Sequence, residues 1–166
     1  MGRAIWVMSG FAAGWSYLGI IKNGWPLWLV ALPMAASALL IAIAQRRRFI
    51  MHSTSGRRRI GRLLLIWTVA EFAAIAVMTT LLIRWHFDEA IAAAAVIIVG
   101  AHFLPLARGI PVPLYYATGA GMIAFGVIAM LLAPSFSFNV AVFGAAATLW
   151  ASVIVMLGKS EPRTAR

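Results

Sequence analysis

Six stretches of mostly apolar residues, each about 20 residues long, follow one another along the chain. An α-helix needs about that length to cross the hydrocarbon core of a bilayer. Short breaks rich in turn-forming or charged residues separate the stretches. The pattern predicts an all-α, polytopic membrane protein, a bundle of six transmembrane helices in one domain over residues 1–158, with a short cytoplasmic tail over 159–166. The expected spans are Ala4–Ile21, Trp25–Ala44, Leu63–Ile83, Glu89–Ala107, Leu114–Leu132 and Val140–Leu157.

The composition supports a membrane protein and argues against a water-soluble domain. Of the 166 residues, 63% are hydrophobic and 11% are charged, whereas soluble domains are about half apolar and about a quarter charged. Cysteine is absent, so the chain can form neither a disulfide nor a thiolate metal site. We expect the first apolar stretch to be a membrane helix, because it lacks the small-residue cleavage site of a signal peptide.

The distribution of basic residues predicts the orientation. If both termini face the cytoplasm, that side carries 12 of the 14 Lys and Arg residues, and the outer side carries only Lys22 and Arg84. Basic residues concentrate on the cytoplasmic side of membrane proteins. Five tryptophans near span ends fit bilayer interfaces, where such rings are enriched; they are Trp6, Trp25, Trp28, Trp67 and Trp85.

Seven arginines gather in the loop expected over residues 45–62: Arg46, Arg47, Arg48, Arg57, Arg58, Arg59 and Arg62. We expect them to set the orientation and to contact anionic lipids at the cytoplasmic face. A specific phosphate-bearing or protein partner is the alternative. The net charge of +10 does not indicate nucleic-acid binding, because no nucleic-acid-binding fold accompanies it.

Two ionisable residues, Glu71 and His102, lie well inside expected spans. Such residues are costly in a bilayer, usually face the protein interior, and often mark functional sites. Counted from the expected helix ends, they lie about 12 Å and about 8 Å from the cytoplasmic side. Because a short outer loop joins their helices, we expect the two side chains to meet.

Other polar residues are expected in the same inner half of the bundle. Thr68 shares the helix face of Glu71, and Tyr115 and Thr118 begin a face of the fifth span that continues through Gly119, Met122 and Gly126. We therefore expect a polar cavity open to the cytoplasm, with Glu71 and His102 in its wall and Tyr115, Thr118 and Thr68 as neutral contacts.

The residues around His102 predict a local distortion of its helix. Pro105 removes a hydrogen bond to the carbonyl of Ala101, and Gly100 permits a close helix neighbour. A freed carbonyl beside an imidazole can bind a proton, a water or a polar ligand. In the structural alternative, His102 bonds Glu71 or a backbone carbonyl only to hold the bundle together.

Enzyme and cofactor motifs are missing. The chain has no HExxH, no glycine-rich phosphate loop and no GxSxG elbow. One histidine and one carboxylate inside the spans are too few for a metal site, and neither lysine lies in a span to hold retinal. We therefore expect no cofactor and no metal, and an enzyme is less favoured than a binding protein. An enzyme acting on a lipid headgroup, with His102 as base, is the third alternative.

The segment Gly-Ala-His-Phe-Leu-Pro-Leu-Ala, with Pro-Leu-Tyr-Tyr-Ala-Thr-Gly at 113–119, resembles a stretch found in small multipass bacterial membrane proteins of unassigned function. The resemblance covers residues 99–119. It implies a multipass fold, and it carries over no activity and no residue role.

These patterns lead to one functional hypothesis and a rival. We expect an integral protein of the bacterial plasma membrane that binds or transports a small solute or a proton around Glu71 and His102. The rival is a non-transporting accessory or scaffold protein, acting through helix contacts and the arginine loop in a homo-oligomer or a larger membrane complex.

Overall fold

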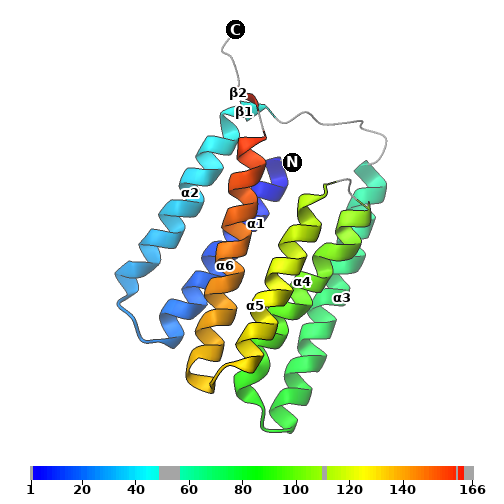
Figure 1. Ribbon diagram of the computed structural model, residues 1–166. Helices are drawn as coiled ribbons and strands as arrows, with labels where there is room; N and C mark the ends of the chain where they lie inside the picture. The colour runs from blue at the N-terminus through cyan, green and yellow to red at the C-terminus, as the bar shows by residue number, and fades with distance from the viewer. Residues whose placement is uncertain (1, 49–56, 110–111, 160, 163–166) are drawn as a thin grey trace. The chain divides into compact units, whose positions relative to one another are not determined.

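The computed structural model describes residues 2–48, 57–109, 112–159 and 161–162. Six long helices dominate it (Figure 1). They are α1 (Gly2–Lys22), α2 (Ala31–Gln45), α3 (Arg57–Arg84), α4 (Ile91–Gly109), α5 (Leu114–Leu131) and α6 (Pro134–Gly158). Short 3-10 helices, η1 (Leu27–Val30) and η3 (Asp88–Ala90), lead into α2 and α4. By length and composition six helical stretches could cross a membrane, and two of them combine a 3-10 helix with the α-helix that follows, η1 with α2 and η3 with α4.

A small strand pairing accompanies the helices. β1 (Arg47–Arg48) pairs antiparallel with β2 (Glu161–Pro162), and Arg48 lies opposite Glu161 in the register. Part of the expected tail therefore lies alongside part of the arginine segment.

Two helices begin earlier than the sequence predicted. α3 starts at Arg57, so residues 57–62 are helical and do not belong to a loop. Arginine is a good helix former, which allows the helix to continue beyond the apolar span. α6 starts at Pro134, where a break was expected, because proline suits the first turn of a helix. Residues 49–56 of the expected basic loop lie outside the described residues.

The same double hydrogen bond ends α1 and α3. In each case the second residue after the helix adopts a left-handed conformation. These residues are Gly24, with φ 64°, and His86, with φ 60°. This geometry lets two N–H groups satisfy carbonyls of the last turn. The N–H to carbonyl pairs are Trp25 to Ile20 (3.1 Å), Gly24 to Ile21 (3.0 Å), Phe87 to Leu82 (2.8 Å) and His86 to Ile83 (3.1 Å). Histidine is among the non-glycine residues that tolerate this conformation.

The contacts divide the chain into two compact units, and each is described by itself. One unit comprises Met1–His52 and Ala146–Arg166, and the other comprises Ser53–Ala145. In the first unit α1 packs against α2. In the second, α4 packs against α5 on one side and α3 on the other (Figure 1).

Glycines bring α4 and α5 close together in the second unit. A Cβ added to Gly119 would lie 2.6 Å from the carbonyl oxygen of Gly100, and one added to Gly126 would lie 2.9 Å from that of Ala93. The expected close helix neighbour of Gly100 is therefore confirmed, and it is α5. The buried face of α5 is also the predicted one, consisting of Tyr115, Thr118, Gly119, Met122 and Gly126, with Ala129 in addition.

α3 contributes a narrow stripe to its contact with α4. Its half-buried residues recur every three or four positions, and they include Thr68, Glu71, Ile75, Thr79 and Leu82. No residue of Leu64–Arg84 is fully buried. Large apolar side chains cover the remaining faces, including Leu65, Val69, Phe72 and Val77. Thr68 therefore shares the Glu71 face, as predicted, and large side chains on the other faces of α3 are apolar and exposed.

The five tryptophans expected at bilayer interfaces are all exposed on the protein surface. Their exposed fractions run from 38% for Trp67 to 69% for Trp28. In water such rings would be unfavourably placed. At the boundary of a bilayer they have both an apolar and a polar environment to occupy.

The close α4–α5 contact leads to a stability prediction. We expect Gly119→Ala to lower the free energy of unfolding by about 1–3 kcal/mol, because the new methyl group meets a backbone oxygen that cannot move aside alone. Thermal unfolding of the purified protein in detergent measures the change. Gly10→Ala is the matched control, since nothing lies within 4 Å of its added Cβ. Equal stability of the two variants would contradict the close contact.

Candidate functional site

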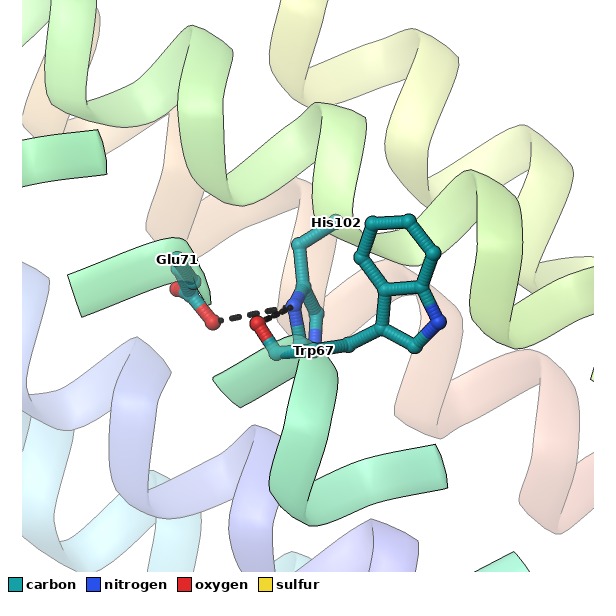
Figure 2. A network of polar contacts seen from close by, with 3 residues as sticks. All are labelled: Trp67, Glu71 and His102. Atoms are coloured by element: carbon teal, nitrogen blue, oxygen red, sulfur yellow. Dashed lines mark hydrogen bonds and ion pairs between the residues drawn. The ribbon is translucent and has the colours of Figure 1, made fainter. Parts of the chain in front are cut away.

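The structure brings Glu71 and His102 into direct contact. Glu71 comes from α3 and His102 from α4, and the Nδ1 atom of His102 lies 3.2 Å from Oε2 of Glu71 (Figure 2). Only 10% of the His102 side chain and 11% of the Glu71 side chain are exposed. The meeting expected from residue counts is therefore present. That it serves as a ligand site stays a prediction.

Both residues lie at the same depth along their helices. Seven residues, about 10 Å of helix, separate Glu71 from Leu64, the first residue of its apolar span. Another seven separate His102 from Gly109, the last residue of the α4 span. Because α3 and α4 run in opposite directions, equal distances from these two ends place the side chains at one level. Measured from the ends of these candidate spans, the two residues show no offset, whereas the ends expected from the sequence gave a difference of about 4 Å.

A backbone carbonyl completes the contact. Nδ1 of His102 lies 3.1 Å from the carbonyl oxygen of Trp67 (Figure 2). A carbonyl oxygen can only accept a hydrogen bond, so this bond requires the hydrogen of the imidazole to be on Nδ1. Glu71 Oε2 lies 3.2 Å from the same nitrogen, within ion-pair distance. The contact therefore favours the Nδ1–H tautomer, with Nε2 free to accept a proton.

Trp67 and Glu71 contact His102 from the same face of α3. They are four residues apart, so the Glu71 side chain and the Trp67 carbonyl lie on the same helix face. The carbonyl also accepts the ordinary helical bond from the Glu71 N–H, and it is therefore shared between two donors. A carbonyl partner for His102 was one of the expected alternatives, and the structure identifies it as the carbonyl of Trp67. The four-residue spacing before Glu71 was the available signal.

Aromatic rings separate the pair from the buried face of α5. The rings of His102 and Phe103 meet edge to face with centroids 6.1 Å apart, and Phe103 packs against Tyr115 at 5.8 Å. His102 follows Gly100 by two positions, a turn of about 200°, so it leaves α4 on the side away from α5. The structure therefore does not bring Tyr115 to the pair as a neutral contact.

The structure places Thr118 on the buried face of α5 and Thr68 on the half-buried stripe of α3. Thr118 is buried on the α5 face beside Gly119, and its hydroxyl donates to the carbonyl of Leu114 at 3.0 Å. Thr118 lies there because the buried face of α5 packs against the side of α4 that carries Gly100. Thr68 is half-buried on the α3 stripe, one position after Trp67.

Pro105 lies inside α4, which stays helical to Gly109. Because proline has no N–H, the carbonyl of Ala101 lacks its usual helical donor. This carbonyl precedes His102 directly. The expected kink at Pro105 stays a prediction.

The arginines of the candidate lipid contact occupy several elements. Arg46 follows α2, Arg47 and Arg48 form β1, and Arg57, Arg58, Arg59 and Arg62 lie in the first two turns of α3. The Arg46 and Arg62 side chains are exposed. On α3 these turns precede the apolar span that begins at Leu64.

The first unit contains a second polar contact between helices. The Ser37 hydroxyl of α2 donates to the carbonyl of Ser9 in α1 at 2.8 Å, and it accepts the Nε1 hydrogen of Trp150 at 3.1 Å. All of these groups are neutral. The contact can hold the helices together, and it cannot change charge.

Among the residues that the structure describes, no group of three His, Cys, Asp or Glu could hold a metal ion. Comparison with protein-family models, with curated proteins and with solved structures gives no match. The six apolar helices indicate a membrane protein, and any finer function has to be argued from its side chains.

The contact between α3 and α4 can be measured by a double-mutant cycle. We expect Glu71→Ala and His102→Ala to show a coupling of about 0.5–1.5 kcal/mol in the free energy of unfolding, the range for polar contacts between membrane helices. Thr80→Ala paired with His102→Ala is the control, because the Thr80 hydroxyl bonds the Ala76 carbonyl of its own helix. Zero coupling in the Glu71 cycle would show that the pair does not join the helices.

Proposed function

We propose that this protein is a multipass membrane protein that binds or transports a proton or a small polar solute at the Glu71–His102 pair. The observation that carries the proposal is the contact between Glu71 Oε2 and His102 Nδ1, 3.2 Å apart within two apolar helices. The polar cavity expected between this pair and the cytoplasm stays part of the proposal.

The cost of placing ionisable groups at membrane depth supports a functional role. A charged side chain near the bilayer centre costs about 2.5–3.5 kcal/mol on insertion scales. A neutral pair such as Ser37 and Ser9 joins helices without this cost. The α3–α4 contact instead uses one group that becomes an anion and one that becomes a cation. Such a pair gains or loses a proton at a defined place between two helices.

A flux assay tests this proposal. Proteoliposomes would be assayed for proton entry with internal pyranine, and for glycerol and ammonium entry by light scattering. We expect at least one flux to exceed that of protein-free liposomes and to fall to that background in Glu71→Gln and in His102→Ala. Glu89→Gln, which changes an exposed carboxylate in η3, should keep the wild-type flux.

If both site variants fold and every flux is unchanged, the pair has no transport role. Retained elution volume and helical circular dichroism in detergent establish folding. Because glutamine keeps the shape of glutamate, Glu71→Gln separates the loss of a titratable group from the loss of packing.

We further propose that both termini face the cytoplasm of a bacterial plasma membrane, and that the seven arginines contact anionic lipid headgroups on that side. The charge asymmetry of the loops supports this orientation. The helical turns of Arg57–Arg62 support the lipid contact, since they continue α3 by about 9 Å beyond its apolar span. Headgroup layers occupy about that depth outside the hydrocarbon.

Single cysteines can test the orientation, because the chain contains none of its own. We expect a membrane-impermeant maleimide to label Asp88→Cys in intact cells, and to label Gln45→Cys only after the membrane is opened. Both positions are exposed. Gln45 ends α2, and Asp88 lies in the turn between α3 and α4. The reverse labelling pattern would place the termini outside.

A specific observation supports the rival function, a non-transporting accessory or scaffold protein. The His102 Nδ1 hydrogen bond to the Trp67 carbonyl would join α3 to α4 without any ligand, and most of the α3 surface is apolar and exposed. Purification in mild detergent separates the two functions. A stoichiometric protein partner, together with unchanged fluxes in Glu71→Gln, supports the accessory protein.

A further inference from the structure

We propose that the ligand of the Glu71–His102 site is a single proton, which binds Nε2 of His102 while the Nδ1 proton passes to the Glu71 carboxylate across the 3.2 Å contact. This inference rests on the proposed function and narrows its ligand from a proton or small solute to the proton alone. Some polar atoms of the pair are occupied by contacts, and others remain open.

The occupied atoms lie between the two side chains. Nδ1 of His102 faces both the Trp67 carbonyl at 3.1 Å and Glu71 Oε2 at 3.2 Å. The open atoms lie at the two ends, Nε2 on the imidazole and Oε1 on the carboxylate. Within the residues that the structure describes, neither open atom has a hydrogen-bond partner. The pair therefore holds a 3.2 Å contact between Nδ1 and Oε2, with one open atom on each side of it.

Both open atoms keep some accessible surface. In the described part of the chain, the fully buried side-chain polar atoms that lack a partner are Ser9 Oγ and Trp15 Nε1. Neither Nε2 of His102 nor Oε1 of Glu71 is among them, although both residues are about nine-tenths covered. A small species can reach these atoms, and a large one would have to displace the surrounding side chains.

The number of donors and acceptors favours a proton over a larger ligand. A proton needs one lone pair, whereas a metal ion or an organic solute needs several directed contacts to replace its water. The described residues hold no cluster of three metal-ligating side chains. The Phe103 ring lies beside His102 and offers no hydrogen-bonding atom. One open lone pair is sufficient for a proton, whereas a solute would need both open atoms and the Ala101 carbonyl together.

Other charged groups on the packed helices lie well away from the pair. On α3, Arg62 precedes Glu71 by nine residues, about 13 Å of helix, and Arg84 follows it by about 20 Å. On α4, Arg108 follows His102 by about 9 Å. On α5, Tyr115 is separated from His102 by the Phe103 ring. The charge of the site therefore depends mainly on the pair itself.

The transfer balances as follows. The unloaded pair is a neutral imidazole with hydrogen on Nδ1 and an ionised carboxylate, with a net charge of −1. A proton binds the Nε2 lone pair and gives an imidazolium beside the carboxylate, with no net charge. The Nδ1–H bond then breaks as an O–H bond forms at Oε2, leaving an Nε2–H imidazole and a carboxylic acid. Loss of the carboxyl proton restores the charge of −1 and leaves the imidazole in the Nε2–H form. A proton that binds Nδ1 as the Nε2 proton leaves then restores the starting tautomer.

The experiment combines histidine ¹⁵N NMR with proton flux. The resting protein in lipid should show His102 as the Nδ1–H tautomer, with its signal assigned by its loss in His102→Gln. Pyranine-loaded proteoliposomes should show proton entry that falls about a hundredfold or to background in Glu71→Gln, on the scale of losing a positioned proton acceptor. The Nδ1–H tautomer should persist in that variant, because the Trp67 carbonyl remains.

The controls change matching residues outside the site. Glu89→Gln alters an exposed carboxylate, and His86→Asn alters an exposed histidine while keeping a side chain that tolerates its left-handed backbone. Both variants should retain proton entry. Glycerol and ammonium entry, measured on the same vesicles, should not depend on Glu71 or His102.

Three results would overturn the inference. A resting Nε2–H tautomer would contradict the proposed path, and so would wild-type proton entry in Glu71→Gln. Loss of glycerol or ammonium entry in the site variants would leave the proposed function standing and show that the ligand is larger than a proton. If wild-type vesicles carry none of the three species above background, the proposed function fails as well.

Discussion

The structure depends on one constraint, which is that polar groups surrounded by hydrocarbon must find partners within the protein. Six helices satisfy this demand for the backbone, since nearly every N–H and carbonyl bonds within its own helix. Helix ends need further partners, and the paired hydrogen bonds after α1 and α3 supply them through Gly24 and His86. Polar side chains face the same demand, and they meet it between helices.

Each unit uses a side chain of one helix to reach a backbone carbonyl of its neighbour. Ser37 of α2 bonds the carbonyl of Ser9 in α1, and His102 of α4 bonds the carbonyl of Trp67 in α3. A helical carbonyl can accept a second hydrogen without breaking its own helix, so both contacts join helices at little backbone cost. They differ in chemistry, because Glu71 adds a titratable group only to the second contact. The proposed function depends on this difference.

Much of the architecture could be predicted because it depends on spacing along the chain. Apolar lengths predicted six helices, and a three-to-four-residue period predicted the buried face of α5 and the stripe of α3. α3 and α6 begin before the expected spans, because hydropathy predicts the apolar span, and a helix can continue through arginines or begin at a proline. The level shared by Glu71 and His102 was predictable because each helix advances by a constant rise per residue.

The sequence by itself therefore determined the helices, their apolar faces and the depth at which a carboxylate and an imidazole lie. Only the tertiary structure decided which groups touch. It chose the Trp67 carbonyl as the second acceptor for His102, and it placed Phe103 between His102 and Tyr115. The physical reason is that depth follows from counting residues, whereas contact also depends on how each helix is rotated about its axis. That rotation is set by packing, here by the glycines that hold α4 against α5.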